Sequence, residues 1–500
     1  MKAQLIENDP EAEIITEKLS LLELFKNKSY MIVFAGQLTN FIAGILMGMT
    51  FSYLIYATTE NAALMGLMNI IGILPSILIT LFAGVIVDRY DQRKILFAAM
   101  IMRCVVFIGF LVTFLMQDNL LIKTITEQPL ENGLTQIVHV LDYTNFIWIM
   151  YGLLFFSNIG MTFLSLAVSA YSKFIIQKKN LLIANSFNQT IIQFSSIIAP
   201  IAAGAIITIS YLYSFIIGVV IISLATILAI VLMYKGKIPT KTEREKQENL
   251  KAEIKQVFND LRVGYTATKS EPKIVFALII YVIFNFATAS INGLYTVITQ
   301  GEMALTPTWL GALQAVMAAI AVLTALIIMK IGKIDRKLII VLLVVFLEAI
   351  GLFLFAFNRN PWILICVNTI PFGFVNGAAN IPTQTLRQEL FSHEKQGRVF
   401  SIAVLFTALA NLLGNIIVAS ISNFVKPTYI LLVGGTICVI VSIIGLILFK
   451  VKSTLHGSDY QEELDQQQAT DMDLPTIIKD PEPSISSYTL QDLDENPTLE

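Results

Sequence analysis

The chain has 500 residues, of which 55% are hydrophobic and only 14% are charged, and its mean hydropathy is +0.72. Soluble domains carry roughly 25% charged residues, so this composition excludes an ordinary soluble protein. The net charge of -2 gives no sign of a nucleic-acid partner, and the three cysteines lie far apart inside apolar stretches, a spacing that indicates neither a disulfide framework nor a metal site.

Long apolar runs follow one another along the chain. A helix needs about 20 mainly apolar residues to cross the hydrocarbon core of a bilayer. We predict the first six spans near residues 30–57, 62–86, 93–117, 144–170, 183–208 and 211–234. The other six lie near residues 273–298, 307–330, 337–357, 361–385, 399–424 and 428–450. The predicted fold is therefore an all-α membrane protein with 12 transmembrane helices in two six-helix halves.

The polar segments divide the chain into five parts. We predict a cytoplasmic segment with an amphipathic helix over 1–29, a six-helix bundle over 30–234, a cytoplasmic linker with an amphipathic helix over 235–272, a second bundle over 273–452 and a disordered acidic tail over 453–500. The apolar stripe of the linker is Leu250, Ile254, Val257, Phe258 and Leu261. The tail has too few apolar residues to bury a core. The loop 118–143 shows no periodicity.

Lys and Arg residues orient the spans. If the N-terminus is cytoplasmic, the inner loops hold twenty-three of them and the outer loops only three. By the positive-inside rule, both termini face the cytoplasm. The three tryptophans, Trp148, Trp309 and Trp362, then begin spans at the outer interface, where indole rings prefer to lie.

The loop between the second and third spans reads GVIVDRYDQRK, residues 84–94. Gly84 allows two helices to approach closely. Asp88 lies at the inner membrane edge, where a carboxylate is costly unless it is paired, and Arg89, Arg93 and Lys94 follow it directly. We interpret this cluster as a conformational latch. A weaker echo in the equivalent loop of the second half contains Gly332, Asp335, Arg336 and Lys337.

These motifs resemble the major facilitator superfamily, whose signature in this loop is Gly-x-x-x-Asp-Arg-x-x-Arg-Lys. The loops KFIIQKKNLLIANSFNQT and QTLRQELFSHEKQGRVFSI, with FVNGAANIPTQTLRQ in the tenth span, look like its macrolide-efflux and enterobactin-exporter branch. The resemblance covers residues 28–450. It implies export of drugs, siderophores or related amphiphiles by alternating access, in the cell membrane of a bacterium.

The chain departs from the pattern of drug–proton antiporters in two places. Such proteins usually carry an Arg in the fourth span three residues before a Gly, whereas this chain has Ser157 before Gly160. Relatives also tend to have an Asp three residues before an Arg in the third span, and here Met100 precedes Arg103. Glu348 in the ninth span is the candidate proton carrier, with a packing role as the alternative. The resemblance places that span at the periphery.

Neutral amides inside the spans are the candidates for a substrate-binding surface, and interhelical hydrogen bonding is the alternative reading. They are Gln37, Asn40, Asn69, Asn158, Gln189, Gln193, Asn285, Asn292, Gln314, Asn376, Asn380, Asn411 and Asn415. Such a surface suits a neutral or amphipathic substrate. Pro200 in the fifth span is a candidate gating kink, because proline interrupts the helical hydrogen bonds, and plain helix distortion with no gating role is the alternative.

The sequence therefore favours a secondary active transporter that exports a hydrophobic or amphipathic small molecule, such as a drug or a macrolide-like or siderophore-like compound. Proton-coupled antiport, with a role in antibiotic resistance, is one form of this hypothesis. An uncoupled carrier or a lysophospholipid flippase is the alternative, and a passive channel or membrane receptor is a different class. We find no enzyme motif and expect no cofactor. The expected partners are the substrate, the bilayer and, if coupled, protons, and we expect a monomer.

Overall fold

The computed structural model describes residues 26–120, 122–129, 135–176, 181–237, 250–331, 337–391 and 393–448. Contacts group residues 1–446 into one compact unit and 447–500 into a second. The architecture below is that of the first unit. The helix expected in the N-terminal segment and the acidic tail expected over 453–500 fall outside the described residues.

Six long helices form the first half of the unit. They are α2 Lys28–Thr59, α3 Ala62–Arg89, α4 Gln92–Leu115, α6 Thr144–Ile175, α7 Leu181–Ile209 and α8 Tyr211–Lys235. Polar caps begin several of them, because a side-chain oxygen satisfies the free N–H groups of a first turn. Asn61 accepts hydrogen bonds from the backbone at the start of α3, and Ser210 does so for α8.

The second half begins with α10 Pro272–Thr296. The later elements are η2 Val297–Glu302, α11 Pro307–Ile331, α12 Lys337–Phe357, α13 Pro361–Ile363, η3 Leu364–Asn368, α14 Thr369–Ala378, α15 Asn380–Leu390, α16 His393–Ile421 and a last helix, Pro427–Leu448. Within the described residues, 12 helices are long and apolar enough to cross a membrane. The predicted number of spans is confirmed.

The tenth span is divided into short elements, which the apolar run did not reveal. Pro371 has no N–H to donate to the preceding turn, and the π-helical segment η3 lies directly before that position. Pro382 likewise follows the break between α14 and α15 at Ala379. The two prolines therefore account for the interruptions.

The loop between α4 and α6 contains a β-hairpin, which corrects the expectation of a segment without periodicity. Its strands are β1 Ile122–Pro129 and β2 Thr135–Asp142, paired antiparallel with Ile122 opposite Asp142, and the short helix α5 Gln117–Leu120 precedes them. We call this end of the bundle the hairpin end. The opposite end is called the linker end, because it carries the linker helix α9 Leu250–Ser270.

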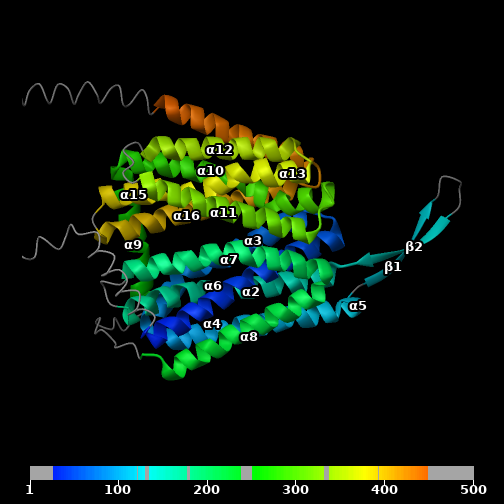
Figure 1. The fold of residues 1–500 in the computed structure, drawn as a ribbon, viewed down its shortest axis with the longest axis horizontal. Coiled ribbons are helices and arrows are strands. Elements are labelled where there is room, and N and C mark those ends of the chain that lie inside the picture. The colour runs from blue at the N-terminus through cyan, green and yellow to red at the C-terminus, as the bar shows by residue number, and fades with distance from the viewer. Residues whose placement is uncertain are drawn as a thin grey trace, which may run out of the picture. The chain divides into compact units, whose positions relative to one another are not determined.

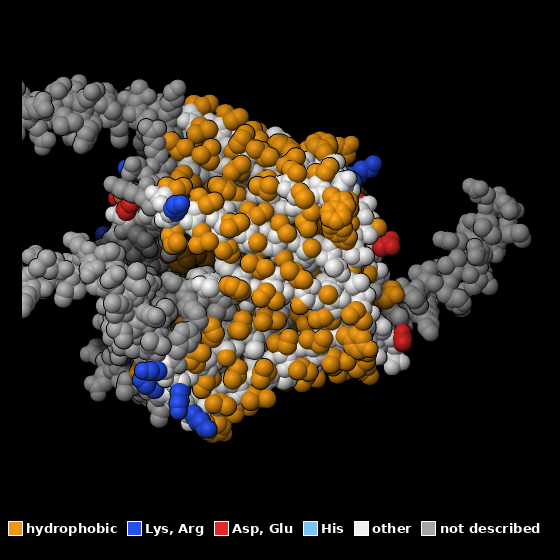
Figure 2. Space-filling view, viewed as in Figure 1, with side chains coloured by type: hydrophobic (Ala, Val, Ile, Leu, Met, Phe, Trp, Pro, Cys, Tyr) orange, Lys and Arg blue, Asp and Glu red, His pale blue; other side chains and the backbone are white. Residues whose placement is uncertain are grey.

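Helix contacts define how the halves pack. In the first half α2 packs on α7 and α8, and α4 packs on α6 and α8; in the second, α10 packs on α16, and α14 packs on α11 and α12. Between the halves, α7 meets α11, and α3 meets α10 and α16 (Figure 1). Hydrophobic side chains cover the middle of the face in Figure 2, and charged side chains appear near the two ends. This distribution is that of a bilayer-spanning surface.

Candidate functional site

One close contact between the halves joins α7 and α11 in a reciprocal arrangement. Gly204 of α7 lies against the backbone of Pro307, and Gly311 of α11 lies against the backbone of Pro200. A Cβ atom at either glycine would overlap the carbonyl oxygen of the opposing proline. One turn farther along, the hydroxyls of Thr208 and Thr308 are hydrogen-bonded at 2.8 Å. We call this contact the Pro–Gly clasp.

A second contact joins α2 to the end of α10 and the segment after it. The hydroxyls of Ser52 and Thr296 are 2.8 Å apart. The Tyr53 hydroxyl donates to the carbonyl of Leu305, and the Gln300 amide donates to the carbonyl of Tyr53 at 3.2 Å. These hydrogen bonds connect the halves close to the hairpin end.

A third contact joins α3 to α16. The backbone N–H of Ala63 donates to the Asn423 side chain at 3.4 Å, and a Cβ atom at Gly66 would lie 2.6 Å from Cβ of Ala419. The hydrogen bonds described above, from Ser52, Tyr53, Ala63, Thr208 and Gln300, all lie at the hairpin end. At the linker end, α9 contacts helices of both halves, α3 on one side and α10 and α16 on the other. The described state is therefore closed at the hairpin end.

Five of the thirteen candidate amides bond within their own helices. Each donates to the backbone carbonyl four residues earlier, as seen for Asn69, Asn158, Asn285, Asn376 and Asn415. Asn415 also donates to the Asn411 side chain at 2.9 Å. These bonds satisfy the N–H groups locally and leave amide oxygens available for other donors.

The remaining candidates differ in their exposure. Asn40 is 2% exposed; its amide nitrogen lies 3.5 Å from Sδ of Met161, and its oxygen has no hydrogen-bond partner in the described structure. The oxygen of fully buried Asn415 is also unpartnered. Gln193 and Gln314 are half-buried, and Gln189 is exposed. The side chains of Asn292 and Asn380 fall outside the described part of the chain.

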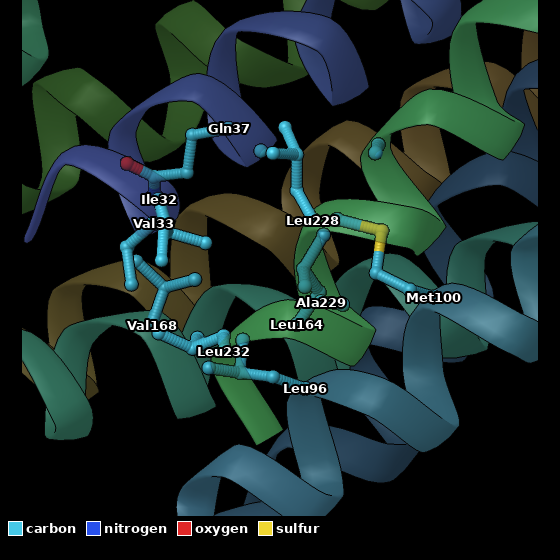
Figure 3. A pocket seen from close by; sticks show the side chains of 12 residues that line it. Ile32, Val33, Gln37, Leu96, Met100, Leu164, Val168, Leu228, Ala229 and Leu232 are labelled. Carbon is cyan, nitrogen blue, oxygen red and sulfur yellow. The ribbon is translucent and has the colours of Figure 1, made fainter. Parts of the chain in front are cut away.

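A small cavity lies inside the first half. Residues of α2, α4, α6 and α8 line a partly open volume of about 20 Å³, which is room for roughly one water molecule. Figure 3 shows Met100 and Leu228 on one side of it and Val33 and Val168 on the other, with Gln37 at its margin. Met100, which stands where relatives tend to have an acid, is thus part of an apolar wall.

Arg103 occupies the interior of the first half one turn beyond Met100. It is 4% exposed, its guanidinium lies 5.5 Å from the centre of the Phe107 ring, and it donates to the carbonyl of Ser157 at 3.4 Å. Gly44 and Gly160 leave space for this side chain. Its Nε atom has no partner in the described structure. A cation from α4 thus lies beside Ser157 of α6, the position at which drug–proton antiporters usually have an arginine.

The described part of the loop motif binds within the first half. Arg93 forms an ion pair with Asp91 at 2.7 Å and donates to the carbonyls of Gly236 at 2.9 Å and Met233 at 3.3 Å. The bond from Arg93 holds the pKa of the Asp91 carboxyl below its ordinary value. Arg93 therefore caps the C-terminal end of α8. Asp91 was not among the predicted site residues, although its position inside the 84–94 motif was a signal.

Other latch candidates are placed only in part. Gly84 has open space around it, Arg89 and Lys94 are exposed, and Lys337 forms an ion pair with Glu389 at 2.9 Å. The side chain of Asp88 and residues Gly332, Asp335 and Arg336 lie outside the described structure. No described bond therefore tests a latch between the halves.

Pro200 and Glu348 have different surroundings. Helix α7 continues through Pro200, whose carbonyl belongs to the clasp. Glu348 is 4% exposed inside the second half. None of the hydrogen bonds between the halves involves Glu348 in the described structure. It is thus a buried carboxyl away from the contacts at the hairpin end.

Comparisons with known proteins agree on one family. A family model described as the Major Facilitator Superfamily matches residues 33–414 and 277–483. Macrolide efflux protein A of Streptococcus pyogenes is 21% identical over 421 residues, which are 84% of this chain and 95% of that protein. A bacterial homologue of the iron transporter ferroportin, solved in an inward-facing state, has a TM-score of 0.62 at 14% identity and covers 84% of this chain and 98% of its own. A D-xylose-proton symporter has a TM-score of 0.60 at 15% identity, with 84% and 97% covered.

Proposed function

Because the chain belongs to the Major Facilitator Superfamily and has the fold of a secondary transporter, we propose that it exports a hydrophobic or amphipathic small molecule by alternating access. The observation that carries this proposal is the position of the contacts between the halves. They are the Pro–Gly clasp, the bonds from Ser52 and Tyr53, and the packing of Gly66 on Ala419. All lie at the hairpin end, so this end opens when they separate.

The chemistry of the buried polar groups supports a neutral or amphipathic substrate. The side-chain oxygens of the candidate amides can accept hydrogen bonds. Those of Asn40 and Asn415 accept no hydrogen bond in the described structure. Apolar walls with few polar groups are typical of small-molecule sites. The similarity to a macrolide efflux protein also supports export and a large, mostly apolar cargo.

The membrane orientation in this proposal follows the distribution of Lys and Arg. The linker end faces the cytoplasm, and the hairpin end faces the outside. The ring centroids of Trp309 and Trp362 are 5.0 Å apart in an edge-to-face contact at the hairpin end, which fits a membrane interface at this end. The described state is then closed to the outside.

The driving force has two candidates. Glu348 is a buried carboxyl that could carry a proton. An uncoupled carrier, including a lysophospholipid flippase, is favoured by Met100 and Ser157, which replace charged residues of proton-driven relatives, and by the absence of a described carboxylate partner for Arg103. We keep both candidates, because Glu348 lies away from the contacts between the halves.

An accumulation assay tests the proposal. Cells that express the protein should retain less of a fluorescent macrolide-like or lipophilic dye than cells with the empty vector. A protonophore should abolish the difference if protons drive export, whereas an uncoupled carrier should be insensitive. Labelled lysophospholipid serves as a parallel substrate. Equal accumulation of every compound with and without the protein would contradict the export hypothesis.

The loop motif gives a matched variant for the same assay. If Asp88 takes part in a latch at the linker end, Asp88→Asn should reduce efflux while the amount of protein in the membrane stays the same. Lys173→Gln changes an exposed charge at the same end and should leave efflux unchanged. Undiminished efflux in Asp88→Asn would remove the latch from the proposal.

A further inference from the structure

Helix α9 lies across the linker end and presents two different faces (Figure 1). One face is buried at Gly264 and Thr268, with Leu261 half-buried beside them. The expected apolar stripe over residues 250–261 included Phe258, but Phe258 is 57% exposed. The side chains of residues 250–257 fall outside the description. Leu261, Gly264 and Thr268 follow one another at spacings of three and four residues, so the buried face continues the line of the predicted stripe, and Phe258 lies off it.

The buried face fixes α9 to the second half. A Cβ atom at Gly264 would lie 2.5 Å from the carbonyl oxygen of Arg398, so the two backbones are in direct contact. Asp260 and Arg398 form an ion pair at 3.0 Å. Helix α9 also contacts α3 of the first half. A ligand on α9 is therefore positioned to act on both halves.

The other face carries exposed Phe258, Arg262, Tyr265 and Lys269 in one row, and exposed Asn259, Thr266 and Ser270 lie beside this row. The spacing of four, three and four residues within the row places it on one side of a helix with 3.6 residues per turn. The two aromatic rings are 57% and 51% exposed. Neither Arg262 nor Lys269 forms an ion pair in the described structure, so both cations are available.

Two aromatic rings interleaved with two cations are suited to binding anionic lipid headgroups. At a membrane surface, aromatic rings insert among the headgroups, and Lys and Arg attract anionic lipids. Helix α9 is connected by a single residue to the spanning helix α10 and crosses the helix ends, so it lies where headgroups are present. Charge and position thus both point to lipid.

We propose that the Phe258–Arg262–Tyr265–Lys269 face of α9 binds anionic phospholipid headgroups of the leaflet at the linker end. Arg262 and Lys269 contact the phosphates, and the two rings lie among the headgroups. Because α9 is fixed to α16 and touches α3, the bound lipid stabilises the described arrangement of the halves at this end. This inference goes beyond the transported substrate.

The test compares lipid binding by two charge variants of the full-length protein purified in mild detergent. Phosphatidylglycerol and phosphatidylcholine are titrated, and the rise in the unfolding midpoint gives an apparent affinity for each. Arg262→Gln/Lys269→Gln should weaken the phosphatidylglycerol affinity about 30-fold relative to phosphatidylcholine. Each cation near an anionic surface strengthens binding roughly five-fold, and the double variant removes two. Lys173→Gln/Lys235→Gln, which removes two exposed charges from the same end, should behave as the wild type.

A second measurement reports on the face directly. Tyr265→Trp is placed in a background in which Trp148, Trp309 and Trp362 are phenylalanine, and the protein is reconstituted with brominated lipids. Stronger quenching by brominated phosphatidylglycerol than by brominated phosphatidylcholine supports the proposal. Equal titration of the wild type and Arg262→Gln/Lys269→Gln, an equal loss in the control pair, or no quenching at position 265 would overturn it. Neither readout needs a transported substrate, so failure of the export hypothesis is seen separately.

Discussion

At the scale of single residues, the interior of the first half is organised around Arg103. The side chain passes between Gly44 and Gly160 and ends beside the carbonyl of Ser157. A buried cation is costly unless its N–H groups find acceptors, and here a backbone carbonyl and the Phe107 ring supply the described contacts. The absence of a side chain at Gly160 is therefore what makes room for Arg103.

Gly160→Ala should destabilise the protein by about 1–3 kcal/mol, because an added methyl group overpacks the site. Its Cβ atom would lie 2.8 Å from Cγ of Arg103, an atom that cannot move away without displacing the buried guanidinium. Unfolding midpoints in detergent measure the effect. Gly36→Ala is the control, since nothing lies within 4 Å of its Cβ position. Equal midpoints for both variants would show that Arg103 does not depend on this space.

At the scale of elements, the Pro–Gly clasp depends on a repeated spacing. Pro200 and Gly204 in α7 are four residues apart, and so are Pro307 and Gly311 in α11. Each glycine faces the proline of the other helix, so the backbones approach closely at two points. Such contacts allow weak Cα–H···O interactions and tight packing. The repeated spacing is visible in the sequence, but only the packing of α7 on α11 makes it reciprocal.

Gly204→Ala and Gly311→Ala should each shift the protein toward a state open at the hairpin end, because the new Cβ atom overlaps a proline carbonyl. Overpacking of about 1–3 kcal/mol corresponds to roughly a 5- to 150-fold shift in the equilibrium. The readout is labelling of Leu310→Cys, a position only 2% exposed, by a membrane-impermeant thiol reagent after Cys104, Cys366 and Cys438 are replaced.

The matched control for the clasp is Gly72→Ala, which adds a methyl group where nothing lies within 4 Å. Labelling of Leu310→Cys should stay at the wild-type rate in this variant. If labelling is equally slow in the clasp variants, the contact between α7 and α11 does not hold the hairpin end closed.

At the scale of the whole molecule, the contacts between the two halves differ between the hairpin end and the linker end. Direct hydrogen bonds and glycine packing connect the halves at the hairpin end. At the linker end, α9 contacts both halves. Arg93 caps the C-terminal end of α8, the last helix of the first half. The proposed alternating-access mechanism needs such an asymmetry, because one end must be able to open while the other is closed.

A disulfide across the halves should stop transport. Ser52→Cys/Thr296→Cys replaces two hydroxyls that are 2.8 Å apart, a separation compatible with a disulfide. In a background without native cysteines, oxidation should abolish efflux and reduction should restore it. Thr50→Cys/Ser214→Cys is the control, because these hydroxyls are bonded within the first half. Efflux that continues through the oxidised Ser52–Thr296 pair would contradict closure and opening at this end.

The sequence by itself determined the fold class, because a membrane imposes a simple physical rule. Backbone polar groups must be satisfied inside the bilayer, so each apolar run of sufficient length forms a helix. The ninth span, predicted near 337–357, is the helix Lys337–Phe357. The loop motif likewise indicated the family that the comparisons identify. These results rest on local composition and spacing.

Only the tertiary structure decided which of the polar residues meet. Arg93, predicted as part of a latch, caps the end of α8, and five of the thirteen candidate amides bond to their own backbone. Apolar periodicity also missed the β-hairpin and the division of the tenth span. The physical reason is that side-chain partners and close backbone approaches depend on which helices pack together. Hydropathy records where a helix lies relative to the membrane and contains no information about its neighbours.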